Sequence, residues 1–136
     1  MSRPAGALAD PLTMKADNAI PLCNSAELQD GGLAVPFDVS YQGMTCRAFA
    51  VRFEGQIHAY LNRCSHVAME MDYQPNRFFD TTGRWLICST HGALYAPDTG
   101  ACVDGPCRHK LVKIALSESD GVVHWHTEYN LQPVEF

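Results

Sequence analysis

Cys64-Ser65-His66 and Cys88-Ser89-Thr90-His91-Gly92 are the two stretches that decide what this chain can fold around. Each stretch pairs one thiolate donor with one imidazole donor, so together they offer four ligands to a metal centre. Both follow short β-type runs, Ile57–Leu61 and Arg84–Cys88. Loops anchored on rigid strands suit metal ligands because the scaffold fixes their geometry. The sequence therefore predicts one metal site built from two loops.

The order Cys-x-His … Cys-x-x-His-Gly is typical of a Rieske [2Fe–2S] centre, in which two cysteines hold one iron and two histidines hold the other. A structural zinc site also accepts two thiolates and two imidazoles. Zinc sites group like ligands, however, whereas here the ligands alternate and a single residue separates Cys64 from His66. Blue copper centres usually combine one cysteine with two histidines. The pattern favours the iron–sulfur centre and leaves zinc as the weaker alternative.

Composition sets the class of protein. The chain has 136 residues, enough for one domain, and 46% of them are hydrophobic, which is ordinary for a globular protein. A net charge of −5 argues against a nucleic acid or an anionic membrane as partner. The six cysteines do not indicate a secreted disulfide scaffold, because residues 1–21 lack the apolar core of a signal peptide. No run is long enough to cross a membrane, so we expect a cytoplasmic protein.

The organisation along the chain predicts an all-β domain. We expect a loose arm over 1–19, a domain over 20–126 and a tail over 127–136, with one helical turn near Ser25–Gln29 that a capping box of Asn24 and Glu27 begins. Glycine turns separate many short β-type runs, which indicates antiparallel sheets. The expected strands are Leu33–Val39, Met44–Phe53, Ile57–Leu61, Arg84–Cys88, Leu111–Leu116 and Val122–His126, and the turns are Gln42-Gly43, Glu54-Gly55, Thr82-Gly83 and Asp120-Gly121.

The chain resembles the soluble Rieske-type ferredoxins that serve ring-hydroxylating oxygenases. Beyond the ligand motif, the resemblance lies in the segments 52–62, Asp98-Thr99-Gly100, Gly105-Pro106, 111–114 and 121–123. It implies stacked antiparallel sheets, with a small cluster-binding subdomain at about 62–105 inserted in a β base. It also implies one [2Fe–2S] cluster, held by Cys64 and Cys88 on the buried iron and by His66 and His91 on the outer iron.

Two departures from the family pattern stand near the expected cluster. The stretch between the ligand segments is a few residues longer than usual, with the surplus around residues 74–82. This insertion is either a docking feature or a surface loop whose two phenylalanines pack underneath. After Gly105-Pro106 the chain has Cys107 where a small residue is usual. Cys107 is either a fifth thiol near the cluster or, as we expect, a buried inert cysteine, and the inert interpretation also holds for Cys23, Cys46 and Cys102.

The resemblance also bears on the reduction potential. High-potential Rieske proteins join their ligand loops by a disulfide, which Met69 and Thr90 cannot form here, and they place a serine donor where this chain has Ala93. Tyr95 is retained as a candidate donor to a cluster sulfur, and a loop containing Pro106 is expected to lie over the cluster. Hydrogen bonds to the sulfurs raise the potential, so we predict a value of roughly −150 to 0 mV. Tyr95 could instead point into the core.

The functional prediction is a one-electron carrier rather than an enzyme. The resemblance implies that the chain takes electrons from an NAD(P)H-dependent flavin or ferredoxin reductase and passes them to a terminal oxygenase, as a monomer or weak oligomer. We do not expect a complete Rieske oxygenase, because that class needs a second, larger domain with a mononuclear iron. The alternatives are a small Rieske subunit of a larger redox complex and, less favoured, a structural zinc-binding module.

Overall fold

A computed structural model describes residues 19–63, 70–72, 75–89, 92–107 and 109–134. This part of the chain is almost entirely β, with a single short 3-10 turn. The elements are β1 (Ala19–Asn24), η2 (Ser25–Glu27), β2 (Val35–Tyr41), β3 (Met44–Phe53), β4 (Gln56–Leu61), β5 (Leu86–Ile87), β6 (Leu94–Tyr95), β7 (Cys102–Asp104), β8 (Lys113–Ile114), β9 (Leu116–Ser119), β10 (Val122–His126) and β11 (Leu131–Gln132).

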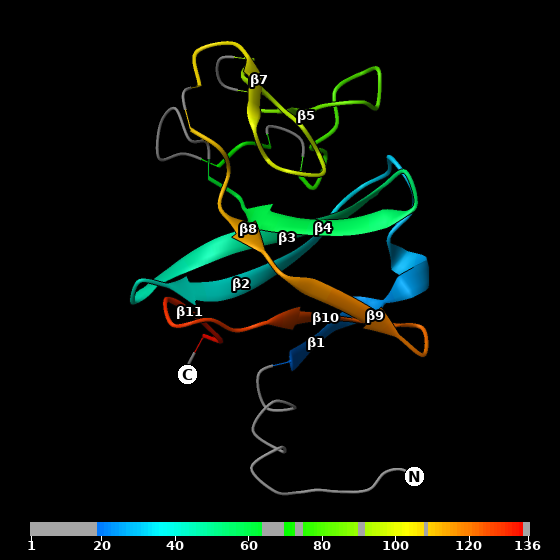
Figure 1. The fold of residues 1–136 in the computed structure, drawn as a ribbon, viewed down its shortest axis with the longest axis vertical. Helices are drawn as coiled ribbons and strands as arrows, with labels where there is room; N and C mark the ends of the chain where they lie inside the picture. The colour runs from blue at the N-terminus through cyan, green and yellow to red at the C-terminus, as the bar shows by residue number, and fades with distance from the viewer. Residues whose placement is uncertain (1–18, 64–69, 73–74, 90–91, 108, 135–136) are drawn as a thin grey trace, which may run out of the picture.

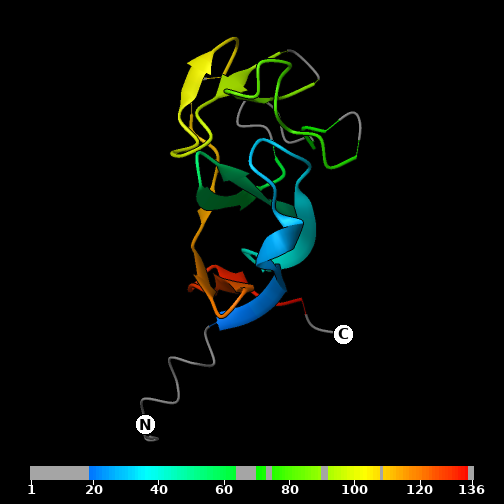
Figure 2. The same cartoon turned by 90° about the vertical axis from the view of Figure 1, so that its right-hand side faces the viewer.

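Three antiparallel sheets are stacked in tiers (Figures 1 and 2). The middle tier is a five-stranded sheet in the order β11-β2-β3-β4-β8. A sheet of β1-β10-β9 lies on one side of it, and a small sheet of β5-β6-β7 lies on the other. The small sheet carries the second ligand segment. The prediction of an all-β fold with stacked antiparallel sheets is therefore confirmed.

The molecule has two hydrophobic cores, one on each face of the middle sheet. Strand β3 contributes to both because its side chains alternate between the two faces. Phe49 and Val51 point to one face, where they pack with the small sheet and the chain around it in what we call the upper core. Ala48 and Ala50 point to the other face, where they pack with the β1-β10-β9 sheet in the lower core. All four side chains are essentially buried. One strand thus joins the two halves of the molecule.

Two-residue turns close the hairpins of the base where they were expected. Glu54 and Gly55 have φ values of 51° and 81°, and Asp120 and Gly121 have φ values of 53° and 77°. Positive φ at both positions is the signature of the tight turn whose twist matches that of paired strands. The Asp30 carboxylate accepts hydrogen bonds from the N–H groups of Glu54 and Gly55, at 2.9 and 2.6 Å. This carboxylate fastens the first of the two turns to the chain before β2.

The short helical turn also lies where the capping box placed it. Residues Ser25–Glu27 form a 3-10 turn, and the N–H of Asn24 donates to the Glu27 carboxylate at 3.0 Å.

Two of the expected strands differ from those in the structure. The expected strand 111–116 is divided at Ala115, because β8 pairs in the middle sheet and β9 pairs in the lower one. The expected strand 84–88 shortens to β5.

Four strands were not predicted, namely β1, β6, β7 and β11. They are short or lie in segments without clear alternation, so pairing with neighbours decides their conformation. The expected tail contributes β11, and its Leu131 is 4% exposed in the lower core. Residues 1–18 of the expected arm lie outside the described residues. No helix in the described chain is long and apolar enough to span a membrane.

Candidate metal centre

The four predicted ligands are not all placed by the structure. Cys88 is described, whereas Cys64, His66 and His91 lie outside the described residues. Among the described residues, no group of three or more His, Cys, Asp or Glu side chains comes together to hold a metal ion. The site is therefore built from Cys88 and from the described residues that hold the two ligand segments.

Cys88 follows β5 directly, and its side chain is fully buried in the upper core. Its N–H donates to the carbonyl of Ala93 at 2.9 Å, and its carbonyl accepts from the N–H of Gly92 at 2.9 Å. Gly92 has a φ of 75°, a left-handed conformation that glycine adopts without steric cost. These bonds close the turn between β5 and β6 around the second ligand segment. They fix the backbone of Cys88 independently of any metal.

The first ligand segment is closed by a buried asparagine. Asn62 is 8% exposed, and its Oδ1 accepts from the N–H of Met71 at 2.7 Å. Its Nδ2 donates to the carboxylate of Asp72 at 2.8 Å, and its own N–H donates to the carbonyl of Arg47 at 2.9 Å. One side chain thus bridges the two ends of the loop that contains Cys64 and His66. Sequence patterns had not singled out Asn62.

Three further hydrogen bonds join this brace to the rest of the molecule. The N–H of Ser89 donates to the carbonyl of Met71 at 2.9 Å, so the two ligand segments are linked through their backbones. The second carboxylate oxygen of Asp72 accepts from the N–H of Asn76 at 2.9 Å. The carbonyl of Asn76 in turn accepts from the N–H of Ala34 at 2.8 Å, just before β2. The network therefore ties the ligand loops to the base.

The segment of Gly105 and Pro106 lies against the second ligand segment, whereas Pro106 itself is exposed. A Cβ on Gly105 would come within 2.9 Å of the Ala93 Cα and 3.3 Å of the Gly92 carbonyl oxygen. Only glycine permits this approach, and the φ of Gly105 is 91°. The loop therefore packs against the backbone of Gly92 and Ala93, and whether it lies over the cluster stays a prediction. Whether Pro106 contacts the cluster stays a prediction.

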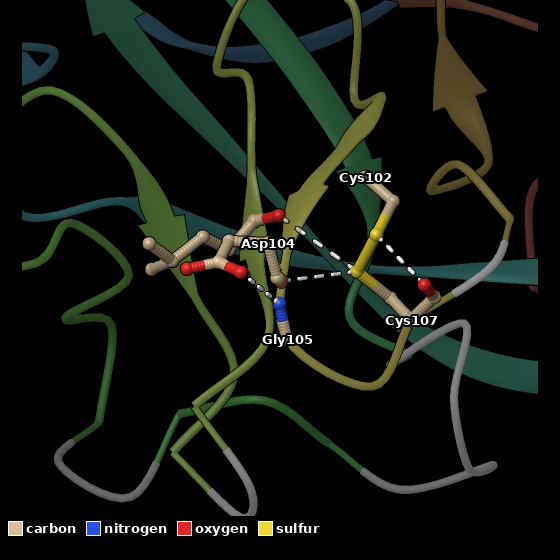
Figure 3. The surroundings of a disulfide bond; sticks show 5 residues. Cys102, Asp104, Gly105 and Cys107 are labelled. Carbon is tan, nitrogen blue, oxygen red and sulfur yellow. Dashed lines mark hydrogen bonds between the residues drawn. A yellow bond between two sulfur atoms is a disulfide. The ribbon is translucent and has the colours of Figure 1, made fainter.

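The expectation that Cys102 and Cys107 are inert thiols is wrong. They form a disulfide with a Cα–Cα distance of 5.9 Å (Figure 3). The sequence argument excluded a secreted disulfide scaffold because residues 1–21 lack the apolar core of a signal peptide. Pairing depends on spatial proximity, however, which β7 and the turn after it create. Cys23 and Cys46 are partly buried and make no disulfide with a described residue. Burial is the main reason that the pKa of the Cys23 thiol is raised.

The insertion around 74–82 packs its aromatic side chains inward. Phe78 stacks on Phe49 of β3, with ring centroids 3.7 Å apart and planes 7° apart. Phe79 lies 6.1 Å from Phe53 between ring centroids, and both phenylalanines of the insertion are buried. The N–H of Ile87 donates to the carbonyl of Phe78 at 2.8 Å. Of the two alternatives for this insertion, the structure favours packing against the middle sheet.

Two of the three candidates for tuning the potential, Ala93 and Tyr95, are buried, whereas Pro106 is exposed. Tyr95 is fully buried in the upper core, on β6. Ala93 is also fully buried and holds Cys88 through its backbone carbonyl. The methyl side chain of Ala93 cannot donate a hydrogen bond. A contact between the Tyr95 hydroxyl and a cluster sulfur stays a prediction.

A second set of polar contacts joins the small sheet to the base at the other side. The Tyr60 hydroxyl, buried under the chain, donates to the carbonyl of Pro97 at 2.7 Å. Burial raises the pKa of Tyr60 far above its ordinary value. The Lys113 ammonium lies 5.7 Å from the centroid of the Tyr60 ring and donates to the carbonyl of Asp98. Desolvation and then the charge of Lys113 lower the pKa of the adjacent His58.

The stacked β tiers carry a buried cysteine after β5 beside a loop that Asn62 braces, and this arrangement fits an iron–sulfur centre. Cys88, the described member of the expected ligand set, is fully buried. The Rieske [2Fe-2S] domain model matches residues 18–123. The chain belongs to the Rieske [2Fe–2S] domain family, and its cofactor is one [2Fe–2S] cluster.

Solved structures with the same fold come from carbazole dioxygenase systems. The ferredoxin of carbazole 1,9a-dioxygenase from Nocardioides aromaticivorans IC177 has a TM-score of 0.65 at 20% identity, covering 82% of this chain and 99% of that chain. The terminal oxygenase of carbazole 1,9a-dioxygenase from Novosphingobium sp. KA1 has a TM-score of 0.65 at 23% identity, covering 87% of this chain. This chain spans 31% of that oxygenase chain. No curated protein matches the chain.

Proposed function

We propose that this protein is a one-electron carrier that takes electrons from an NAD(P)H-dependent flavin or ferredoxin reductase and delivers them to a terminal oxygenase. The observation that carries the proposal is the Rieske domain match over residues 18–123. A bound Rieske cluster takes up and releases one electron at a time. The protein's own residues hold the site, exclude water from it and present it to partners.

The proposed ligands are Cys64 and Cys88 for the buried iron, and His66 and His91 for the outer iron. The full burial of Cys88 supports its place on the inner iron. The brace of Asn62 supports a preformed first loop, because it joins Met71 to the end of β4 on either side of Cys64 and His66. Preformed loops let the ligands bind without a large ordering cost.

Two neighbours support the role of carrier. The chain covers 99% of the Nocardioides ferredoxin, which is the ferredoxin of a carbazole 1,9a-dioxygenase. Another structure is described as the reduced complex between oxygenase and ferredoxin, and this chain covers 28% of the matching chain. The Novosphingobium match shows that the same fold occurs within a terminal oxygenase. The oxygenase match keeps a relay subunit of a larger redox complex as the alternative.

The role is tested by spectroscopy of the purified protein. We expect a brown protein that is EPR-silent when oxidised and rhombic after dithionite, with a lower average g than all-cysteine clusters. The midpoint potential is expected at roughly −150 to 0 mV, because Ala93 supplies no side-chain donor. A midpoint above about +150 mV would contradict this tuning argument. A colourless protein with one zinc per chain would contradict the function itself.

Ligand substitutions test the assignment of residues. Cys88→Ser is expected to lose the iron and the rhombic signal, whereas Cys46→Ser, a control at a partly buried cysteine outside the ligand motif, keeps both. His91→Ala is expected to lose the signal as well. Electron transfer is then tested by mixing the protein with an NADH-dependent flavin reductase and a ring-hydroxylating oxygenase. Product formation that does not depend on the protein would exclude the carrier role, and tight co-purification with the oxygenase would favour the subunit.

A further inference from the structure

The disulfide between Cys102 and Cys107 closes a small ring that no step of the proposed function uses. Cys102 lies on β7, and Cys107 follows five residues later, beyond the turn of Gly105 and Pro106. A ring this short removes little freedom from the unfolded chain, so it is a weak staple for the whole domain. The two buried cores already supply the packing. We therefore expect the disulfide to act on the chain close to Cys102 and Cys107 rather than on the stability of the whole domain.

The ring touches the second ligand segment directly. Gly105, within the ring, is packed so closely that a Cβ would lie 2.9 Å from the Ala93 Cα. The carbonyl of Ala93 accepts the N–H of Cys88, at 2.9 Å. Two steps through backbone contacts thus lead from the disulfide ring to the buried cysteine. Any loosening of the ring removes one support of that segment.

The surroundings of the two sulfurs suit thiols as well as a disulfide. The Cys102 Sγ lies 2.9 Å from the carbonyl oxygen of Cys107, and the Cys107 Sγ lies 3.4 Å from that of Asp104 (Figure 3). A disulfide sulfur has no hydrogen to donate, whereas each thiol would find a carbonyl acceptor in place. Reduction would therefore leave no buried donor unpaired.

Part of the ring that the disulfide closes is exposed. Cys107 is 8% exposed, whereas Cys102 is partly exposed. The chain between them, from Val103 to Pro106, is exposed. Cys102 is therefore the more exposed of the two cysteines, and we expect an incoming thiolate to attack its sulfur. In the reducing compartment that we expect for this chain, a disulfide is a transient or redox-sensing bond.

We propose that Cys102 and Cys107 are a reversible thiol–disulfide site, reduced by a dithiol, that controls how firmly the Gly105 loop is held on the second ligand segment. A thiolate of the dithiol attacks the Cys102 sulfur, the bond to Cys107 breaks, and Cys107 leaves as a thiolate that takes up a proton. The second thiol of the reductant then attacks the mixed disulfide, and Cys102 leaves and is protonated. The reductant departs as a disulfide, so two electrons and two protons reach the protein.

The site itself is tested on the folded holoprotein by alkylation and peptide mapping after treatment with dithiothreitol. We expect Cys102 and Cys107 to become alkylated while the far-UV circular dichroism stays unchanged, and to re-form the disulfide with oxidised glutathione. A bond that opens only when the protein is unfolded would overturn the proposal, because it would be a permanent staple. Cysteines found as thiols that never oxidise would overturn it as well.

The coupling is tested by hydrogen exchange in the same states. We expect exchange of the amides of residues 92–95 and 103–107 to rise several-fold on reduction. The variant Cys102→Ser with Cys107→Ser should show the fast exchange permanently and ignore dithiothreitol, whereas Cys46→Ser should behave like the wild type. Unchanged exchange at residues 92–95 would overturn the coupling. These readouts need no electron-transfer activity, so a protein without the cluster would contradict the proposed function and still report on this site.

Discussion

Asn62 shows at the scale of one residue how the chain organises its first ligand loop. A buried amide is costly unless its donors and acceptor are paired, and here Met71 and Asp72 pair with it from the far end of the loop. The pairing is specific because an amide carries both an acceptor and a donor. Neither a carboxylate nor an aliphatic side chain of this size could make both bonds.

Asn62→Ala is therefore expected to destabilise the fold by about 2 to 4 kcal/mol, because it leaves the Met71 N–H and the Asp72 carboxylate without this partner. Urea unfolding measures the loss, and iron content per chain reports the loop. Asn62→Asp should lower the iron content too, because a second carboxylate would face Asp72. The exposed Asn130→Ala is the control and should change stability by less than about 0.5 kcal/mol. Full iron content in both Asn62 variants would refute the brace.

His58 gives the molecule a pH dependence of stability. Its pKa is lowered from 6.5 by desolvation and by Lys113, whose ammonium lies 3.5 Å from the Nδ1, while Asp98 acts in the opposite direction. The unfolded chain therefore binds a proton at this residue more readily than the folded protein. The contribution of His58 to the free energy of unfolding is greatest above about pH 6.5 and decreases as the pH drops below that value. Urea midpoints between pH 5 and 8 should show the decline, and His58→Gln should flatten it. An equal slope in the variant would exclude His58 as its source.

At the scale of elements, Gly105 allows the turn after β7 to pack against the second ligand segment. Gly105 and Gly121 both have positive φ, at 91° and 77°. The space around them differs, because a Cβ at Gly121 would meet nothing within 4 Å and one at Gly105 would meet the backbone of Ala93. The two positions therefore separate backbone strain from the contact with the ligand segment.

Gly121→Ala is expected to cost about 1 to 2 kcal/mol of stability, from the left-handed conformation alone. Gly105→Ala should cost at least about 1 kcal/mol more, because the loop must move away from the second ligand segment. Urea unfolding compares the two variants, and the rate at which each loses its visible colour in the presence of a chelator reports on the site. Equal behaviour in both measurements would mean that the contact at Gly105 does not hold the segment.

At the scale of the whole molecule, the ligand-bearing half is joined to the base through the middle sheet. Phe49 and Val51 face the upper core while Ala48 and Ala50 face the lower one, so β3 belongs to both. The stack of Phe78 on Phe49 and the bond from the Tyr60 hydroxyl to Pro97 complete the junction. Such shared packing predicts that the two halves unfold together.

Phe78→Ala is expected to lower stability by about 3 to 5 kcal/mol, because it opens a cavity beneath the upper tier. It should also separate two transitions that coincide in the wild type, so that visible absorbance is lost at lower urea than the far-UV circular dichroism. The exposed Tyr129→Ala, an aromatic truncation outside both cores, is the control and should change neither. A single shifted transition in Phe78→Ala would show that the remaining contacts suffice to couple the halves.

Local pattern predicted the base of the fold well. Strands β3 and β10 begin and end where alternation placed them, and the capping box and the turn pairs lie at the expected positions. These features depend on residues close in the chain, such as the glycine turns and the alternating apolar side chains of β3. The small sheet was largely missed, because β6 and β7 are too short to show a period and exist through their pairing.

The amino-acid sequence by itself determined the all-β class and the family, because both rest on alternation, turn chemistry and a short ligand motif that needs no three-dimensional context. The ligand set, apart from the burial of Cys88, still rests on that motif. Only the tertiary structure decided that Asn62 closes the first loop, that Phe78 packs under the site, and that Cys102 and Cys107 are bonded. Each of these depends on the distance between residues that the sheets bring together, and such distances are not encoded in any local pattern.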